Sequence, residues 1–219
     1  MSFSPLPDIL QSDLARLRGA AVLELGAADG RFTRALREAG VDVVPLDRRR
    51  PVPSGGVVAD ARALPVRPGA VRLIAAANLL QHLGRITDVA AALGEWVGCL
   101  APDGCLHILQ DDPLADTPAR RNDRELRDWL ARLVPTRGRL PALADLREAL
   151  AGSGGTSGWS FGRELNRTAP PDRERALALL RGDGGVPDRA TAALAAAIAR
   201  DGLDYGWYWW ARWRGGTAP

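Results

Sequence analysis

Short apolar runs alternate with amphipathic segments along the first half of the chain. Buried strands are expected at the apolar runs, which cover residues 20–25, 41–47, 56–60, 71–78 and 105–111. Between them, apolar side chains recur at helical spacing over residues 8–18, 32–39 and 86–100. Gly40 is well placed to end the second of these helices, and a turn at 102–104 follows the third. Strands that alternate with helices predict a parallel sheet with helices on both faces.

The second half of the chain has a different pattern. Helices are predicted at 123–134, 141–151, 172–181 and 188–201, and the Gly/Ser-rich segment 152–158 is typical of a loop. Strands are predicted at 159–167 and 205–214, and the second of these holds four of the seven tryptophans. Tyr205, Trp207, Trp209 and Trp213 alternate onto one face. This spacing favours packing against helices over an aromatic cage for a substrate.

Composition narrows the class of protein. The 219 residues fit one domain, and 46% apolar with 25% charged residues is ordinary for a soluble protein. No apolar run is long enough to predict a membrane span, and the start MSFSPLPDIL lacks the features of a secretory signal. We therefore expect a cytoplasmic protein. A disulfide between Cys99 and Cys105 is conceivable, but reduced thiols are the default in the cytosol.

The charge gives little sign of a nucleic-acid partner. The formal net charge is +3, and all basic residues are arginine. Abundant Ala, Gly, Pro and Arg without Lys indicates a coding bias more than a nucleic-acid surface. Basic residues cluster only at 48–50 and 120–121, whereas a phosphate-tracking surface normally shows a longer stripe.

Three acids follow or end predicted strands where a ligand would bind. Glu24 lies near the end of the first strand, Asp47 ends the second and Asp60 ends the third. Ligands of parallel sheets bind at the carboxyl ends of the strands. After the first strand, Gly26 and Gly30 bracket a tight turn into a helix, whose N-terminus favours an anion. The turn does not match the G-x-G-x-x-G pattern of dinucleotide-binding proteins.

The acids suit a particular kind of ligand. Asp47 could accept hydrogen bonds from both hydroxyls of a ribose. Asp60 could accept from an adenine amine while the amide of Ala61 donates to a ring nitrogen. Glu24 would face an ammonium group, and the helix N-terminus would face a carboxylate. S-adenosylmethionine has all four groups. In the alternative interpretation, Glu24 is a structural acid, Asp47 a turn residue and Asp60 a helix N-cap.

The order of these motifs resembles the class I S-adenosylmethionine-dependent methyltransferases. The matching segments are ELGAADG at 24–30, VVPLD at 43–47, VVADARALP at 57–65, LIAAANLLQHL at 73–83 and LAPDGCLHI at 100–108. The resemblance covers residues 18–112 most clearly. It implies one Rossmann-like, doubly wound α/β domain over 1–219, whose seven-stranded sheet is mostly parallel, with one antiparallel strand near the C-terminus. The helices at 117–151 and 170–203 would lie on the substrate side.

The resemblance also implies roles for individual residues. Glu24, Gly26, Ala28 and Gly30 would line the methionine and ribose portion, Asp47 would hold the ribose, Asp60 and Ala61 the adenine, and Asn78 the methionine moiety. Gln81 and His82 would face the substrate, with His82 as the candidate base. No metal is expected. Two departures from the family pattern stand out, because Ala28 replaces a glycine and Val71-Arg72 replaces the usual Phe-Asp. For Arg48 two interpretations stay open, stacking on the adenine or simple solvation.

The expected function is methyl transfer from S-adenosylmethionine, with S-adenosylhomocysteine as product, to a small-molecule acceptor. A nucleophile such as a phenol, thiol or activated carbon would need no dedicated base, which fits the absence of an obvious acid/base pair. One alternative is a catalytically inactive binding or scaffold domain, and a second is an RNA or protein methyltransferase. The sequence leaves the acceptor and the oligomeric state open.

Overall fold

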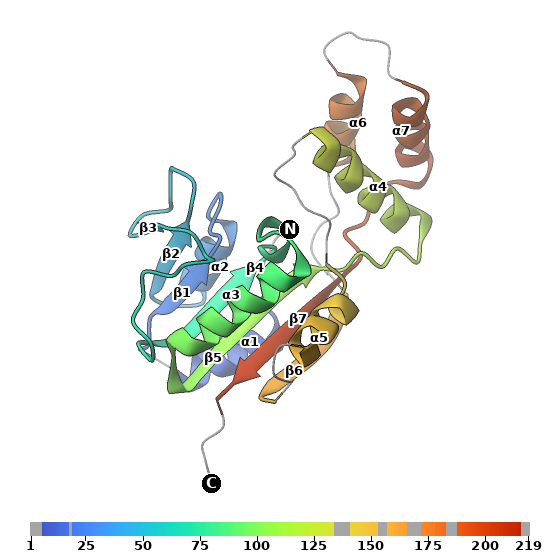
Figure 1. Cartoon of the computed structure of the whole chain (residues 1–219). Coiled ribbons are helices and arrows are strands. Elements are labelled where there is room, and N and C mark those ends of the chain that lie inside the picture. The colour runs from blue at the N-terminus through green and yellow to red at the C-terminus, as the bar shows by residue number, and fades with distance from the viewer. Residues whose placement is uncertain are drawn as a thin grey trace.

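The computed structural model describes residues 6–17, 19–133, 141–152, 157–165, 172–182 and 188–215. Its centre is a seven-stranded sheet in the order β3-β2-β1-β4-β5-β7-β6 (Figure 1). The strands are β1 (Val22–Leu25), β2 (Val43–Asp47), β3 (Val57–Val58), β4 (Val71–Ala77), β5 (Leu100–Asp111), β6 (Trp159–Leu165) and β7 (Trp207–Arg214). β7 runs antiparallel to both β5 and β6, and the other pairs are parallel. The predicted sheet, with one antiparallel strand near the C-terminus, is confirmed.

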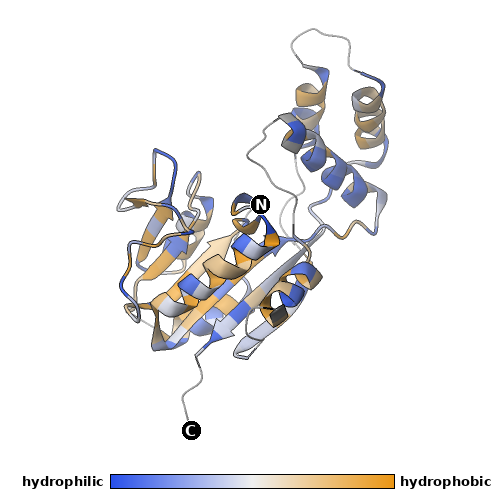
Figure 2. Cartoon of the chain, viewed as in Figure 1, coloured by the Kyte–Doolittle hydropathy of each residue, from blue (hydrophilic) through white to orange (hydrophobic). Residues whose placement is uncertain are grey.

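Helices cover both faces of the sheet, whose central strands are predominantly apolar (Figure 2). These helices are α1 (Asp8–Arg16), α2 (Arg31–Glu38), α3 (Ile86–Cys99) and α5 (Leu143–Gly152). On one face, Leu10 of α1 and Leu36 of α2 are buried in one apolar cluster with Val22 of β1. On the other face, Trp96 of α3 and Leu146 of α5 belong to the larger core. Burial on both faces explains why the central strands show continuous apolar runs in place of alternation.

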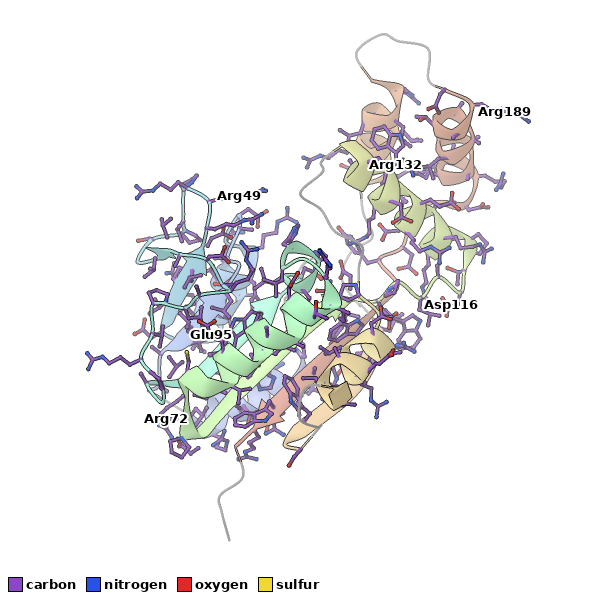
Figure 3. The ribbon with its side chains drawn as sticks, viewed as in Figure 1. Arg49, Arg72, Glu95, Asp116, Arg132 and Arg189 are labelled. Carbon is purple, nitrogen blue, oxygen red and sulfur yellow. The ribbon has the colours of Figure 1, made fainter. Side chains whose placement is uncertain are left out.

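Three further helices form a separate unit, which we call the helical lobe. It consists of α4 (Pro118–Leu133), α6 (Arg173–Arg181) and α7 (Arg189–Asp201), and has its own apolar cluster. Leu126, Leu177 and Ile198 are buried in that cluster. α4 follows β5, whereas α6 and α7 lie between β6 and β7, so two insertions build the lobe beyond the carboxyl end of β5 (Figure 1). Asp116 lies close to the start of α4, and Arg132 and Arg189 lie on the lobe itself (Figure 3).

Several local expectations differ from the structure. α5 packs beside α3 on the sheet, away from the helical lobe, because Leu146 and Leu150 fill the larger core. β5 begins at Leu100, so the expected turn at 102–104 is part of a strand, and a register shift against β4 accommodates the extra residues. β3 is limited to two residues. The predicted positions 18, 134, 153–156 and 166–167 lie outside the described residues.

The aromatic strand and the cysteines follow the packing interpretation. Trp209 is fully buried, and its indole N–H donates to the carbonyl of Pro141 (3.0 Å). Trp213 packs against the larger core, while Trp207 is half-buried and donates to Asp116. Cys99 and Cys105 are both buried and form no disulfide.

A buried ionic cluster joins α1 to the sheet. The carboxylate of Asp13 accepts two hydrogen bonds from Arg212 of β7 (2.7 and 2.8 Å) and one from Nε2 of His107 on β5 (2.9 Å). Burial lowers the pKa of His107, so its ring is neutral at pH 7 and Nε2 carries the proton that it donates. Asp13 is 1% exposed, and its partners come from strands far along the chain.

Candidate active site

A cavity of about 710 Å³ lies at the carboxyl ends of the parallel strands. Its volume is within the range of about 300–1,000 Å³ that is common for ligand sites. The lining includes the turn after β1, the ends of β2 and β5, the loop after β3, the segment after β4 and one side of α4. The predicted site residues in the lining are Gly26, Ala28, Asp47, Arg48, Asp60, Ala61, Asn78, Gln81 and His82. Arg49, in the lining too, projects from the loop after β2 (Figure 3).

The turn after β1 is held by its own backbone amides. The amides of Gly26 and Ala27 donate to the carbonyl of Leu46 (2.8 and 3.1 Å), and the amide of Ala28 donates to Oδ2 of Asp47 (2.9 Å). These amides therefore fix the turn against β2. Gly26 has φ +75°, and a Cβ there would lie 2.7 Å from Leu79, so this position requires glycine.

Ala28 adopts a conformation that glycine would adopt more readily. Its φ is +46°, in the left-handed region, where an L-residue is strained. The sequence departure at this position therefore does not prevent the turn, because alanine takes up the required backbone conformation.

Asp47 is exposed to the cavity and retains hydrogen-bonding capacity. Its Oδ1 accepts from the amide of Arg49 (2.8 Å), and its Oδ2 accepts from Ala28. Each carboxylate oxygen has two lone pairs, so one remains on each oxygen for a ligand hydroxyl. This arrangement fits the two neighbouring hydroxyls of a ribose.

Glu24 and Gly30 do not belong to the described lining of the cavity. Glu24 is 1% exposed, and its Oε2 accepts a hydrogen bond from the hydroxyl of Thr33 on α2 (2.6 Å). Burial raises the pKa of Glu24 to about 7, against the opposing effect of Thr33. Gly30 is the N-cap of α2 and lines an adjoining groove beside Pro53. Both residues therefore support the turn from outside the cavity.

The loop after β3 is anchored to α3. The indole N–H of Trp96 donates to the carbonyl of Ala61 (2.6 Å), and Glu95 accepts from the amide of Leu64 (2.6 Å). Asp60 accepts hydrogen bonds from the side chain of Arg62, and these lower the pKa of Asp60 to about 2. Asp60 is thus ionised at pH 7, and a ligand amine would share it with Arg62.

The segment after β4 brings Asn78 against the end of β5. Oδ1 of Asn78 accepts from the amide of Asp111 (2.8 Å) and from Gln110, and its Nδ2 donates to Oδ2 of Asp111 (3.2 Å). Asn78 has φ +51°, and these side-chain bonds stabilise that conformation. Its side chain is therefore engaged with β5. His82 ends a short 3₁₀ helix (Leu80–His82) at the cavity wall.

Several lining residues were not among the predicted ones, and Asp111 and Arg127 are two of them. Asp111 ends β5, and Arg127 projects from α4 and bridges Asp111 and Asp123. The run Gln110-Asp111-Asp112 at the end of a buried strand was an available signal, since it follows the same rule as Asp47 and Asp60. Arg127 carried no such signal, because its partner on β5 is 16 residues away.

Metal-ligating side chains come together in one place within the described residues, at Asp13, Cys105 and His107 on the α1 face. Asp13 is already occupied by Arg212 and His107. A guanidinium bonded to this buried carboxylate opposes a cation, so this cluster is a structural ionic contact.

The sequence matches a family model described as a methyltransferase domain over residues 5–155. The chain belongs to this methyltransferase family. S-adenosylmethionine is the methyl donor, and the lining fits it through the free lone pairs of Asp47 and the volume of the cavity. No curated protein sequence gives a significant match. None of the helices in the described part of the methyltransferase has the length and apolarity that a membrane span requires.

Solved structures share the methyltransferase fold at low sequence identity. The YcgJ protein from Bacillus subtilis is 16% identical, with a TM-score of 0.63 and coverage of 95% of this chain and 97% of that one. A SAM-dependent methyltransferase from Archaeoglobus fulgidus is 14% identical, with a TM-score of 0.56 and coverage of 94% and 93%. Geranyl diphosphate C-methyltransferase from Streptomyces coelicolor, solved with S-adenosylhomocysteine, is 13% identical, with a TM-score of 0.52 and coverage of 94% and 80%.

Proposed function

We propose that this methyltransferase transfers the methyl group of S-adenosylmethionine to a small-molecule acceptor. The observation that carries the proposal is the continuity of the cavity. It runs from Asp60 beyond β3, past Gly26 and Asn78, to Asp111 at the end of β5 and Asp128 on α4. The strand order makes this a path across the sheet, with room for a nucleoside at one end and an acceptor at the other.

The residues at the β2 and β3 end would hold the adenosyl group. Asp47 would accept the ribose hydroxyls, and Asp60 with Ala61 would contact the adenine, with Arg48 beside them. Gly26, Ala28 and the backbone of Asn78 would border the methionine portion. Glu24 and Gly30 would support the turn from outside the cavity, Glu24 as a buried carboxyl near Asp47 and Gly30 as the N-cap of α2.

The surface charges support a small acceptor over RNA. Arginines 16, 31, 62, 72, 120, 127, 163, 200 and 212 all form ion pairs with aspartates. A guanidinium that is paired with a carboxylate contributes little to binding phosphates. These nine of the 29 arginines therefore add little to the free positive stripe that a nucleic-acid substrate requires.

Catalysis would depend on placement. When bound, S-adenosylmethionine supplies a methyl group that its sulfonium already activates. The chain would orient the acceptor in line with that methyl group and keep water out beneath α4. His82 lines the cavity and would serve as a base only for an acceptor that must lose a proton before attack.

Calorimetry with S-adenosylhomocysteine tests the cofactor site. Asp47→Ala removes the proposed ribose contact and should weaken binding at least tenfold. Asp42→Ala is the matched control, because Asp42 is exposed and immediately precedes β2 at the opposite end of the strand. It should leave the affinity within twofold of the wild type. Equal affinities for the wild type and Asp47→Ala, or no binding by the wild type, would refute the assignment.

A further inference from the structure

The end of the cavity farthest from Asp47 has an excess of hydrogen-bond acceptors. We call this region the acidic corner and define it by Gln81, Asp111, Arg127 and Asp128, all of which line the cavity. Its residues come from the segment after β4, the end of β5 and α4. Because β1 and β2 carry the proposed cofactor contacts, the neighbouring β4 and β5 border the side open to an acceptor.

Asp111 is the central group of this corner. It is 3% exposed, and its Oδ2 accepts hydrogen bonds from Arg127 and from Asn78. These two bonds fix the orientation of the carboxylate. Its Oδ1 is buried and has no hydrogen-bond partner among the described residues. Buried polar atoms are rarely left unsatisfied, because the loss of hydration is not compensated.

A second buried acceptor lies in the same lining. Oε1 of Gln81 also has no hydrogen-bond partner among the described residues. Asp128, one residue after Arg127 on α4, forms no ion pair with any residue that the structure describes. A separate cavity of about 10 Å³ borders Asp111 on the side of Tyr205. It has room for one water molecule at most, so an organic acceptor can reach Asp111 only from the main cavity.

The charges of the corner are predominantly negative. Asp111 and Asp128 contribute two carboxylates, whereas Arg127 contributes one guanidinium, which is bonded to Asp111 and also to Asp123 outside the main cavity. A phenolate, thiolate or carboxylate would be repelled here. A group that donates N–H bonds and gains positive charge would be stabilised.

We propose that the acidic corner binds a basic amine as the methyl acceptor, with the N–H groups of the amine directed toward the carboxylate of Asp111 and the side-chain amide of Gln81. This inference rests on the proposed function. The acceptor is then an amine, which attacks through its nitrogen lone pair, in place of the acidic phenol, thiol or activated carbon expected from the sequence.

The chemistry explains the need for a carboxylate. At pH 7 a basic amine arrives mainly as its ammonium, which first gives one proton to solvent. The lone pair of the neutral amine then forms the new N–C bond while the S–C bond breaks, and the pair from that bond stays on sulfur. Positive charge thus moves from sulfur to nitrogen, and the product is a methylammonium with S-adenosylhomocysteine. Asp111 would stabilise the charge that develops on nitrogen and so lower the barrier of the transfer step.

The test compares three probes that share a benzene ring and differ in the polar group. Benzylamine, p-cresol and benzoate are titrated into the full chain saturated with S-adenosylhomocysteine, and are then offered with S-adenosylmethionine in a methyl-transfer assay. Benzylamine should bind at least tenfold more tightly than the other two and should be methylated at nitrogen. Equal or stronger binding of p-cresol or benzoate would overturn the proposal, as would S-adenosylhomocysteine binding without methylation of benzylamine.

Variants separate the corner from the rest of the site. Asp111→Asn keeps the shape but removes the charge, and should lower kcat/KM for benzylamine 10- to 100-fold while the affinity for S-adenosylhomocysteine changes less than twofold. Asp128→Asn, on α4, should raise KM several-fold with little effect on kcat. Asp112→Asn is the matched control, because Asp112 pairs with Arg163 and is not in the described lining of the main cavity. Unchanged kcat/KM in both Asp111→Asn and Asp128→Asn would refute the role of the corner. Loss of S-adenosylhomocysteine binding in the wild type would instead refute the cofactor site, and this inference with it.

Discussion

Replacing Glu24 with glutamine should remove a pH dependence from the stability of the protein. The carboxyl of Glu24 is buried on the α2 face of β1, with the Thr33 hydroxyl as its hydrogen-bond donor. Burial raises its pKa to about 7, from an ordinary value of 4.5. The folded state therefore binds this proton more tightly than the unfolded chain does. The corresponding stability is fully present below pH 4.5 and is lost as the pH rises through about 7.

The size of the effect follows from the two pKa values. One pKa unit corresponds to about 1.4 kcal/mol, so the interval from 4.5 to about 7 is worth roughly 3 kcal/mol in the free energy of unfolding. Most of this difference should be lost between pH 5 and pH 8, because that interval covers most of the range between the two pKa values. Glutamine still accepts the hydrogen bond from Thr33 but does not ionise, so this loss should be absent in Glu24→Gln.

Urea unfolding of the cofactor-free protein at pH 5, 6, 7 and 8 measures this difference. The comparison uses the change with pH and not the absolute stability, because the glutamine amide alters the local hydrogen bonds at every pH. Glu95→Gln is the matched control, since Glu95 is half-buried on α3 and also accepts a hydrogen bond. It should retain the wild-type slope. Parallel pH profiles for the wild type and Glu24→Gln would refute the argument that burial governs this carboxyl.

Three further substitutions test other parts of the structure. Ala28→Gly should relieve the strained left-handed backbone at this position. The free energy of unfolding should rise by about 0.5 kcal/mol, after the greater entropy of glycine in the unfolded chain is subtracted. A thermal scan would then show a Tm higher by roughly 1–2 °C, and a lower Tm would contradict the strain. Asp13→Asn leaves the Arg212 guanidinium without its carboxylate and should cost about 3 kcal/mol in urea unfolding, without changing the affinity for S-adenosylhomocysteine; a loss below 1 kcal/mol would contradict a buried ion pair. Arg62→Ala removes the exposed ion-pair partner of Asp60. Calorimetry should then show S-adenosylhomocysteine binding about two- to fivefold more tightly. Weaker binding would indicate that Arg62 itself contacts the ligand.

The fold could be predicted largely because its signals are local. Apolar runs that end in Asp47 and Asp60 mark strands whose carboxyl ends face a ligand, and the order of these runs gave the sheet. The extent of β5 could not be predicted in the same way. Pro102 and Gly104 are typical turn residues, and only the irregular pairing of β5 with β4 holds them in a strand.

The position of a site residue could be predicted where it depends on the residue's own strand. It could not be predicted where a contact with a side chain from another helix or strand determines which way the residue faces. Asp47 lines the cavity as the strand pattern indicates. Glu24 has the predicted sequence position, but Thr33 on α2 provides a partner inside the protein. Arg127 was overlooked because a separate helix, α4, delivers it to Asp111. Such long-range contacts leave no periodic trace in the sequence.

The helical lobe is inserted between strands of the sheet at two points. Its apolar cluster is separate from the two clusters that lie on the faces of the sheet. Its helices can therefore change in length and sequence without disturbing the packing beneath the adenosyl end of the cavity. A lineage of such enzymes could exchange one methyl acceptor for another by remodelling α4 and its neighbours, while the machinery for the donor is inherited intact. The same separation allows the lobe to open or melt locally while the sheet stays folded, which would give bulky substrates a way in and products a way out.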